Sequence, residues 1–288
     1  MPELPEVETI VRDLNKKIHN QTIKNVVINY SKAILPLSPT TFNRRLKNNQ
    51  IIKVTRRAKI IIIHLSDNLF LLIHLKMTGQ LIYVPTQGKV IYGGHPQVGG
   101  GLNLPNKYTR IIINFIDGST LYFNDLRKFG WLKLVEKIKM DAMLKSHGPE
   151  PLSKHFSETT LKAIFSRYLN RTIKQTLLDQ TLLAGLGNIY VDEACFLAKL
   201  KPDRKNSTLT KNEIEKLRNS IIAILKLAIK KKGTSAKNYL TASGTPGGFV
   251  KYLNVYGRAK DLCHVCNHPI EKIKHAGRGT HFCPQCQK

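Results

Sequence analysis

The strongest constraint on how this chain folds is a set of four cysteines near its C-terminal end. They form the pairs Cys263-x-x-Cys266 and Cys283-x-x-Cys286, with sixteen residues between the pairs. This spacing is typical of a zinc site with four thiolate ligands, in which one tetrahedral ion stabilises a segment too small to build its own core. Disulfide bonds are the alternative, but nothing in the sequence indicates secretion. We therefore predict one structural Zn²⁺.

The segment between the two cysteine pairs is predicted to be a β-hairpin. Residues 270–274 and 280–282 can pair, which leaves 275–279 as the tip, with Arg278 between two glycines. The metal would fix the hairpin that presents Arg278, and an arginine held in this way suits a phosphate or a DNA groove. Arg278 could equally be a solvated turn residue. The fifth cysteine, Cys195, falls on a predicted helix and is expected to be a buried, small apolar side chain.

The charge of the chain indicates a polyanionic partner. Lys and Arg number 46 against 19 Asp and Glu, so the formal charge of the 288 residues is +27. An excess of this size is not needed for folding and most simply indicates nucleic acid. No apolar run approaches the roughly 18 to 20 residues of a membrane helix, and the first residues lack the basic and apolar pattern of a secretion signal. We expect a cytoplasmic protein with no membrane partner.

The first half of the chain, after a leading amphipathic helix, is predicted to be β-structure. Short apolar and β-branched runs between residues 20 and 135 are separated by turn residues, which favours a β-sandwich or barrel. A glycine-rich segment at 93–101 is expected to be an exposed loop. The predicted strands are residues 51–54, 59–65, 69–75, 81–84, 110–115 and 120–123.

The second half is predicted to be helical. From Ser157 the apolar residues recur at helical spacing, with Ser157 and Thr160 as candidate N-caps. Further helices are expected at about 174–183, from about residue 188, and at about 210–232. The Gly, Ser and Thr-rich residues 233–248 are predicted to form a mobile loop.

The start of the chain places a proline where it can become the terminal amine. If Met1 is removed, Pro2 begins the protein as a secondary amine with Glu3 beside it. A terminal α-amine has a reference pKa of roughly 7.7 to 8, so a neutral, nucleophilic fraction exists near pH 7. Attack on a sugar aldehyde carbon would give an iminium, and the Glu3 carboxyl group suits acid and base steps. The alternative is that Pro2 and Pro5 only start an amphipathic helix.

Other segments carry side chains that suit DNA. Two glycines within residues 185–187 precede a predicted helix, with Asn188 as its expected N-cap, and the exposed amides of such a turn can bind phosphate. Many helix corners, however, contain the same pattern. An enzyme that swings a nucleotide out of a duplex must fill the hole with an apolar wedge and an arginine. Met77, Arg127 and Phe129 are the candidates, and the core is the alternative location for Met77 and Phe129.

These features occur in one order along essentially the whole chain, and in this combination the sequence resembles the formamidopyrimidine-DNA glycosylases, bacterial enzymes that remove oxidised purines. The matching segments are Pro2-Glu3-Leu4-Pro5-Glu6, Arg57-Ala58-Lys59, the segments of Met77 and of Arg127 and Phe129, Gly187-Asn188-Ile189-Tyr190, and the four cysteines. The resemblance implies an α+β multidomain fold: an N-terminal β-sandwich with a leading helix, a helix-two-turn-helix domain and a C-terminal zinc finger. It also implies a monomer that acts on damaged double-stranded DNA in the nucleoid.

The resemblance implies domain bounds as well. They are 1–135 for the catalytic β-sandwich domain, 136–150 for a linker, 151–250 for the helical DNA-binding domain with a mobile lesion loop, and 251–288 for the zinc finger.

The resemblance assigns a role to each matching residue. Pro2 would be the Schiff-base nucleophile, and Glu3 the proton donor for base removal. Lys59 would be the proton donor in β-elimination, and Arg278 would be the donor in δ-elimination. The implied contacts are with DNA for Met77, Tyr108, Arg127, Phe129, Arg171, Lys174 and Asn188, with the lesion for Glu6, and with zinc for Cys263, Cys266, Cys283 and Cys286.

One departure from the family and two alternative functions bear on these roles. Tyr108 stands where the family usually has histidine, although tyrosine can still donate to a phosphate. An enzyme of the endonuclease VIII type, which prefers oxidised pyrimidines, usually begins Pro-Glu-Gly-Pro-Glu, and Leu4 argues against it. The second alternative is a zinc-containing nucleic-acid-binding protein without catalytic activity. In that case the presence of Pro2 and of the wedge residues would be a coincidence.

Overall fold

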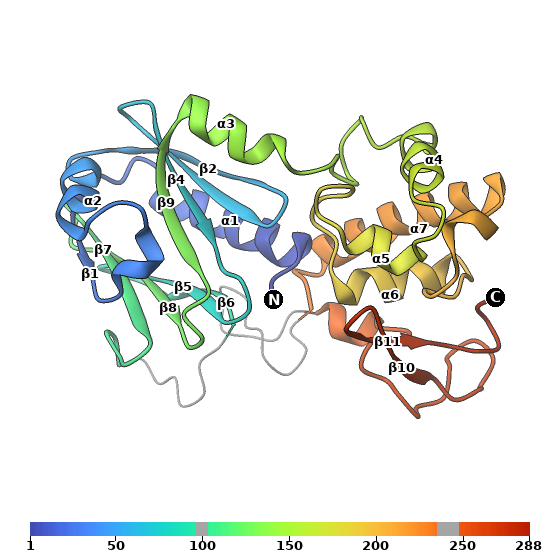
Figure 1. Cartoon of the computed structure of the whole chain (residues 1–288). Coiled ribbons are helices and arrows are strands. Elements are labelled where there is room, and N and C mark those ends of the chain that lie inside the picture. Colours follow the sequence, from blue (N-terminus) through green and yellow to red (C-terminus); the bar gives the residue numbers. More distant parts are fainter. Residues whose placement is uncertain (96–102, 235–247) are drawn as a thin grey trace. The chain divides into compact units, whose positions relative to one another are not determined.

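The computed structural model describes residues 1–95, 103–234 and 248–288 (Figure 1). By their contacts the described residues form two units. Met1–Lys145 with residues 232–234 and Gly248 make the first unit, and Ser146–Lys231 with Phe249–Lys288 make the second. Among these residues, no helix has the length and apolar character needed to cross a membrane.

The first unit is a sandwich of two antiparallel sheets, as predicted. The five-stranded sheet has the order β1 (Ile23–Ile28), β7 (Thr109–Phe115), β8 (Thr120–Asp125), β5 (Gly79–Val84) and β6 (Ile91–Gly94). The four-stranded sheet has the order β2 (Ile51–Arg57), β3 (Ile60–Leu65), β4 (Leu69–His74) and β9 (Trp131–Glu136). The helical elements are α1 (Leu4–Ile18), η1 (Ser31–Ile34), α2 (Pro39–Leu46) and α3 (Lys137–Lys145).

Strand β3 shows why the four-stranded sheet has uninterrupted apolar runs. Ile61 and Ile63 lie in the core that joins the two sheets, whereas Ile60 and Ile62 lie in a second cluster with Met140 of helix α3. Because successive side chains of a strand face opposite sides, a strand covered on both sides is apolar throughout. Helix α3, which supplies this cover, lies within the stretch that the sequence analysis treated as a linker.

The glycine-rich segment begins as a strand. Gly93 and Gly94 belong to β6, which pairs with β5, so the predicted loop at 93–101 is wrong for its first two residues. A Cβ at Gly93 would lie 2.8 Å from Cγ1 of Ile10, which explains why a residue without a side chain stands there. Residues 96–101 of the predicted loop lie outside the described residues.

The second unit contains four helices around one core and a C-terminal hairpin. The side chain of Ser157 accepts a hydrogen bond from the amide of Thr160, so Ser157 is the N-cap of helix α4. Helix α5 ends at Leu178, five residues before the predicted end, because Asp179 then caps a turn by accepting from the amide of Thr181. The elements are α4 (Glu158–Arg167), α5 (Ile173–Leu178), α6 (Asn188–Leu197), η2 (Asn206–Thr208), α7 (Lys211–Lys230), η3 (Phe249–Tyr252), β10 (Glu271–His275) and β11 (Arg278–Phe282).

The C-terminal segment packs on helix α6 of the same unit. Phe196 of that helix lies in a small apolar cluster with Val255, Ile270 and two of the cysteines. The side-chain amide of Gln287 also donates to the carbonyl oxygen of Leu200 at 2.7 Å. The finger therefore has a fixed place relative to helix α6.

Candidate functional site

The proline start lies at the front of a buried helix. Pro2 and Glu3 are both buried, and Glu3 is the N-cap of helix α1. Leu4 is the first residue of the helix, and Pro5 is the second. The carboxylate of Glu6 accepts a hydrogen bond from the amide of Glu3 at 2.9 Å. This bond closes the first turn of the helix directly behind Pro2.

Glu6 also fastens a distant segment to this helix start. Its second oxygen accepts from the amide of Thr234 at 2.8 Å and from the Thr234 hydroxyl at 3.1 Å. Gly233, with a φ of +79°, leaves room for the carboxylate, because a Cβ there would lie 2.7 Å from Oε1. Thr234 in turn forms a β-bridge with Gly248. Glu6 thus anchors the base of the segment predicted to contact the lesion; residues 235–247 of that segment lie outside the described residues.

Lys59 lies in the two-residue turn between strands β2 and β3, one position before the strand. Its side chain is 4% exposed. Ala58, the other turn residue, has a φ of +53°, a conformation that two-residue hairpin turns require. The turn is tied to helix α1, because Arg56 donates to the Glu8 carboxylate at 2.6 Å and to the Ala58 carbonyl oxygen at 3.4 Å.

The charge of Glu8 is maintained by these contacts. Burial alone would raise the pKa of Glu8, but the charges of Arg56 and Arg12 and their hydrogen bonds lower it below its ordinary value. Helix α1, which directly follows Pro2 and Glu3, and the Lys59 turn are therefore held together by one ionised carboxylate.

The predicted wedge residues lie at the surface of the first unit. Phe129 is 52% exposed, and Arg127 is exposed with its guanidinium group 4.6 Å from the centre of the Phe129 ring. Met77 is half-buried. The exposure of Phe129 excludes the alternative of a core position. Tyr108 is half-buried, and the ammonium group of Lys107 lies 5.3 Å from its ring centre.

Asp125 organises the wedge, and the sequence analysis missed it. Its side chain is fully buried and accepts from the hydroxyl of Thr78 at 2.5 Å, from the amide of Arg127 at 3.2 Å and from the amide of Gly130 at 2.7 Å. Thr78 follows Met77, so one carboxylate fixes both wedge segments. An Asp directly before an exposed turn is the local signal that could have found it, because such side chains accept from amides two residues on.

Arg278 is exposed at the end of the C-terminal hairpin. It pairs with His275, and only Ala276 and Gly277 form the turn, with φ values of +49° and +72°. The predicted tip of five residues is therefore too long. A two-residue turn with two positive φ values continues the strand pairing up to the turn, so Arg278 is held in the ladder.

Lys174 is buried and paired within the second unit. Its side chain is 0% exposed, and its ammonium group donates to Asp192 at 2.5 Å and to the Gly279 carbonyl oxygen at 3.3 Å. The predicted DNA contact of Lys174 stays a prediction, and it would require the buried ammonium group to lose these partners first.

Asn188 and Arg171 are partly engaged within the protein. Asn188 is the first residue of helix α6 and not its N-cap, which is Gly187. Its side-chain nitrogen donates to the Gly279 carbonyl oxygen at 2.9 Å, which leaves its second N–H for another acceptor. Arg171 is exposed; it donates to Asp179 at 2.9 Å and its guanidinium lies 4.6 Å from the Tyr168 ring centre.

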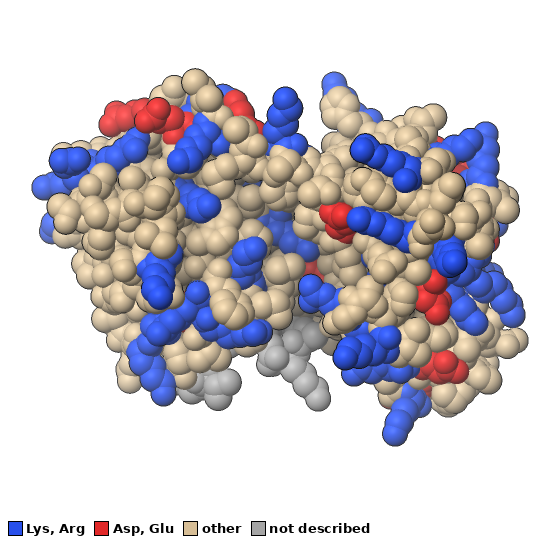
Figure 2. Space-filling view, viewed as in Figure 1, with Lys and Arg blue, Asp and Glu red and all other residues tan. Residues whose placement is uncertain are grey.

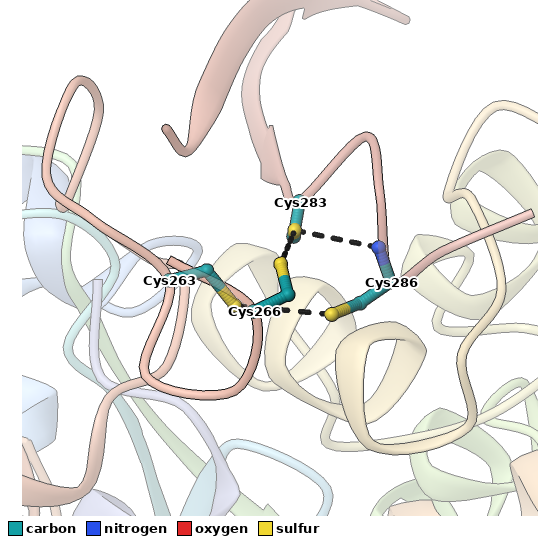
Figure 3. Close-up of side chains that lie close together, drawn as sticks. All are labelled: Cys263, Cys266, Cys283 and Cys286. Carbon is teal, nitrogen blue, oxygen red and sulfur yellow. Dashed lines mark hydrogen bonds between the residues drawn. The ribbon is translucent and has the colours of Figure 1, made fainter. Parts of the chain in front are cut away.

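The four cysteines of the finger converge as predicted (Figure 3). Their sulfur atoms all lie within 4.8 Å of one another, with 3.9 Å between Cys263 and Cys286 and 3.4 Å between Cys266 and Cys283. Four thiolates about 2.3 Å from a tetrahedral zinc ion are about 3.8 Å apart, so the cluster fits Zn²⁺.

Position separates the four ligands from the fifth thiol and the pKa does not, because burial raises the pKa of Cys283 and Cys286 as it raises that of Cys195. At Cys263 burial would raise the pKa, but hydrogen bonds from the amides of Val265 and Cys266 lower it to about 7, which favours the metal-binding thiolate. Cys195 lies in the core of the second unit, away from the cluster, and burial raises its pKa. It is a packing residue, as expected.

Among the charged side chains on the face drawn in Figure 2, basic ones outnumber acidic ones and are spread over both units. Acidic side chains are fewer there and lie in small groups. Basic side chains thus lie on the folded surface, and a surface of this kind attracts a polyanion.

Three family models match the chain. Formamidopyrimidine-DNA glycosylase N-terminal domain matches residues 1–132, and Formamidopyrimidine-DNA glycosylase H2TH domain matches residues 147–239. Zinc finger found in FPG and IleRS matches residues 261–288, which contain the four cysteines. The zinc finger thus holds one structural zinc ion.

Relatives and solved structures match over the full length. The chain is 40% identical to the formamidopyrimidine-DNA glycosylase of Ligilactobacillus salivarius, over 100% of this chain and 99% of the relative. It is 41% identical to that of Pediococcus pentosaceus, over 100% and 99%. A Lactococcus lactis Fpg in complex with DNA that contains an abasic site has a TM-score of 0.87 and 36% identity over 99% of both chains. A mutant of that protein in complex with Fapy-dG DNA has a TM-score of 0.86 and 36% identity over 100% of both chains.

Proposed function

The chain belongs to the formamidopyrimidine-DNA glycosylase family, and from this premise we propose that it is a bifunctional DNA glycosylase and apurinic-site lyase of base excision repair. Its substrates are oxidised purines, 8-oxoguanine and formamidopyrimidines, in double-stranded DNA. One observation carries the proposal. Pro2 and Glu3 lie buried at the start of a helix to which the ion pair of Glu8 and Arg56 ties the turn of Lys59.

Removal of the base begins at the amine that the loss of Met1 exposes. The nitrogen of Pro2 forms a bond to the sugar carbon C1′ and loses its proton, while the bond from C1′ to the base breaks and the base leaves protonated. The bond from C1′ to the ring oxygen then breaks, and Glu3 donates a proton to that oxygen. The product is an iminium that stays cationic, because its nitrogen has no proton to lose.

Strand cleavage follows because the cationic iminium withdraws electrons from the neighbouring sugar carbons. Loss of a proton from C2′ gives an enamine, whose electrons break the bond from C3′ to the 3′ phosphate; Lys59 donates the proton in this β-elimination. Loss of a proton from C4′ then breaks the bond from C5′ to the 5′ phosphate, with Arg278 as the donor for δ-elimination. Water releases the sugar fragment from Pro2, and a one-nucleotide gap remains.

The remaining contacts are proposed from exposure and family resemblance. Met77, Arg127 and Phe129 fill the void left by the flipped nucleotide, and Glu6 acts at the lesion. Phe129 is half exposed and Arg127 stacks on it, which supports their entry into a duplex. The proposed phosphate contacts are those of Tyr108, Arg171 and Asn188.

We also propose the location and the organisation of the protein. The bacterial relatives support action in the cytoplasm on nucleoid DNA. One chain supplies every proposed catalytic group, which supports a monomer. The domain bounds stay as proposed from the sequence, with two refinements. Helix α3, which lies within the proposed linker, belongs to the first unit, and residues 232–234 also make their contacts with the first unit.

The test is covalent trapping of the iminium. The processed protein is incubated with duplexes that carry 8-oxoguanine opposite cytosine or an oxidised thymine, and borohydride is added. Trapping on 8-oxoguanine by the wild type and none by Pro2→Gly is expected. Preferential trapping on oxidised thymine would favour the endonuclease VIII type, and no trapping on any lesion would leave only a DNA-binding protein.

A protein with an uncleaved tag before Pro2 should bind DNA and fail to cut it.

A further inference from the structure

A buried ion pair in the second unit grips one strand of the zinc-finger hairpin. The side chains of Lys174 in α5 and Asp192 in α6 are both 0% exposed, and their charged atoms lie 2.5 Å apart. Lys174 also donates to the carbonyl oxygen of Gly279 at 3.3 Å. Asp192 uses its second oxygen to accept from the amide of His281 at 2.9 Å. Two helices thus hold strand β11 through its backbone.

Two further contacts fasten the same end of the hairpin. Asn188 donates to the Gly279 carbonyl oxygen at 2.9 Å, and the hydroxyl of Thr172 is 2.8 Å from Nε2 of His275. Arg278 lies between these points, because His275 is its partner across the strands and Gly279 follows it. The side chain of Arg278 is exposed while the backbone on both sides of it is held.

Stability alone does not account for a buried ion pair of this kind. Taking two charges out of water costs several kcal/mol per ion, and apolar residues of similar volume often fold as well. A two-stranded hairpin, in contrast, is marginal by itself and needs an external support. The cysteines fix the open end of this hairpin, where Cys283 follows the end of β11. The ion pair fixes its other end, beside the turn.

We infer that Lys174 and Asp192 are positioning residues that hold the Arg278 turn of the zinc finger in place for δ-elimination. The consequence for the reaction rests on the proposed function, whereas the consequence for the hairpin does not. Neither residue touches DNA or donates a proton to it. Both act through the backbone of Gly279 and His281, which they hold on either side of Thr280.

The first test measures the hairpin directly, by hydrogen exchange in the zinc-loaded protein. In Asp192→Asn, amides of residues 276–282 should exchange faster by on the order of tenfold, because a charged acceptor is lost. Asn206→Ala is the matched control. Asn206 is 3% exposed and donates to the Tyr168 carbonyl oxygen at 2.8 Å and to Thr176 at 2.7 Å; both partners lie in the same unit and outside the hairpin. The control should leave exchange in 276–282 unchanged.

A second variant protects the test from simple misfolding. Lys174→Met with Asp192→Leu removes both charges and leaves no unpaired ion, so the helices should pack and the melting temperature should stay near that of the wild type. The hairpin should nevertheless exchange faster, since neither Met nor Leu can bind its backbone. Wild-type exchange in this folded double variant would overturn the inference.

The second test measures the reaction on a duplex with a preformed abasic site. Asp192→Asn should lower the ratio of δ-elimination to β-elimination products by on the order of tenfold, because misplacement of a reacting group by about 1 Å is costly. The yield of borohydride trapping should stay within about twofold, because Pro2 is not affected. Asn206→Ala should keep the wild-type product ratio.

The two failures are distinguishable. If Arg278→Ala leaves the product ratio unchanged, the role of Arg278 in the proposed function is wrong, and hydrogen exchange alone decides the positioning of the hairpin. If Arg278→Ala lowers the ratio but Asp192→Asn and the double variant do not, the positioning role is overturned and the proposed function stands.

Discussion

At the scale of the residue, buried carboxylates do much of the organising in the first unit. Glu6 joins the helix start behind Pro2 to Thr234, and Asp125 joins the two wedge segments. Each carboxylate is buried and accepts several hydrogen bonds. An amide side chain of the same shape has only one acceptor oxygen, so it cannot replace a carboxylate at such a point.

Asp125→Asn should therefore be destabilising. The amide group would face the amides of Arg127 and Gly130 or the hydroxyl of Thr78, and at least one buried donor would lose its acceptor. The expected loss is about 1 to 3 kcal/mol of unfolding free energy, measured by urea denaturation. Asp141→Asn is the control, because Asp141 forms an exposed pair with Lys137 and should change stability by less than about 1 kcal/mol. Equal stability of the two variants would contradict this account of Asp125.

At the scale of the element, the start of helix α7 shows how one side chain combines capping and charge. Thr210 is the N-cap, and Glu213 accepts from the Thr210 amide at 2.8 Å and from Arg204 at 2.7 Å. The hydrogen bond from Arg204 is the main reason that the pKa of Glu213 falls from 4.5 to about 2; burial opposes it, and Thr210 adds to it.

This lowered pKa predicts an acid dependence of stability. Because the folded pKa lies below the unfolded one, the contribution of Glu213 is complete above about pH 4.5 and is lost as the pH falls through about 2. Glu213→Gln should cost about 1 kcal/mol at pH 6, since the pair is partly exposed and screened. The difference from the wild type should shrink toward pH 3 in urea titrations. A difference that is constant with pH would assign the effect to packing.

The zinc finger is an element that depends on its metal. Removal of zinc with a chelator should unfold residues 261–288, because only a small apolar cluster would remain to hold them. Circular dichroism should keep most of the helical signal of α4 to α7, which has its own core. Products of δ-elimination should fall more than trapping at Pro2, and added zinc should restore them. An unchanged product ratio in protein shown to be free of zinc would refute this dependence.

At the scale of the whole molecule, the formal charge of +27 governs the interaction with DNA. The logarithm of the binding constant should fall linearly with the logarithm of the salt concentration, by about 0.9 per phosphate neutralised. Arg171→Gln should reduce this slope by about 1, because one cation is lost. Lys174→Met should leave the slope unchanged, since Lys174 is buried and paired. Fluorescence anisotropy over a salt series measures both slopes, and an equal fall for both variants would support a phosphate contact of Lys174.

Local patterns in the sequence determined much of this protein. The cysteine spacing predicted the metal cluster, the turn residues predicted most strands of the sandwich, and Ser157 predicted the start of helix α4. Pro2 and Glu3 are adjacent in the sequence, so they are neighbours in any fold. These features depend on residues a few positions apart, whose interactions are encoded by spacing and backbone preference alone.

Only the tertiary structure decided which charged side chains are exposed and which are buried. Lys174 carries an ammonium group, which can bind a phosphate. The fold instead places Asp192 and the Gly279 carbonyl oxygen beside this group and buries it away from water. Glu6 meets Thr234 across 228 positions of sequence. Burial and long-range pairing depend on where whole elements pack, and no local pattern specifies that. The sequence therefore names the chemical groups, and the packing of helices and strands determines which of them act on DNA and which hold the others in place.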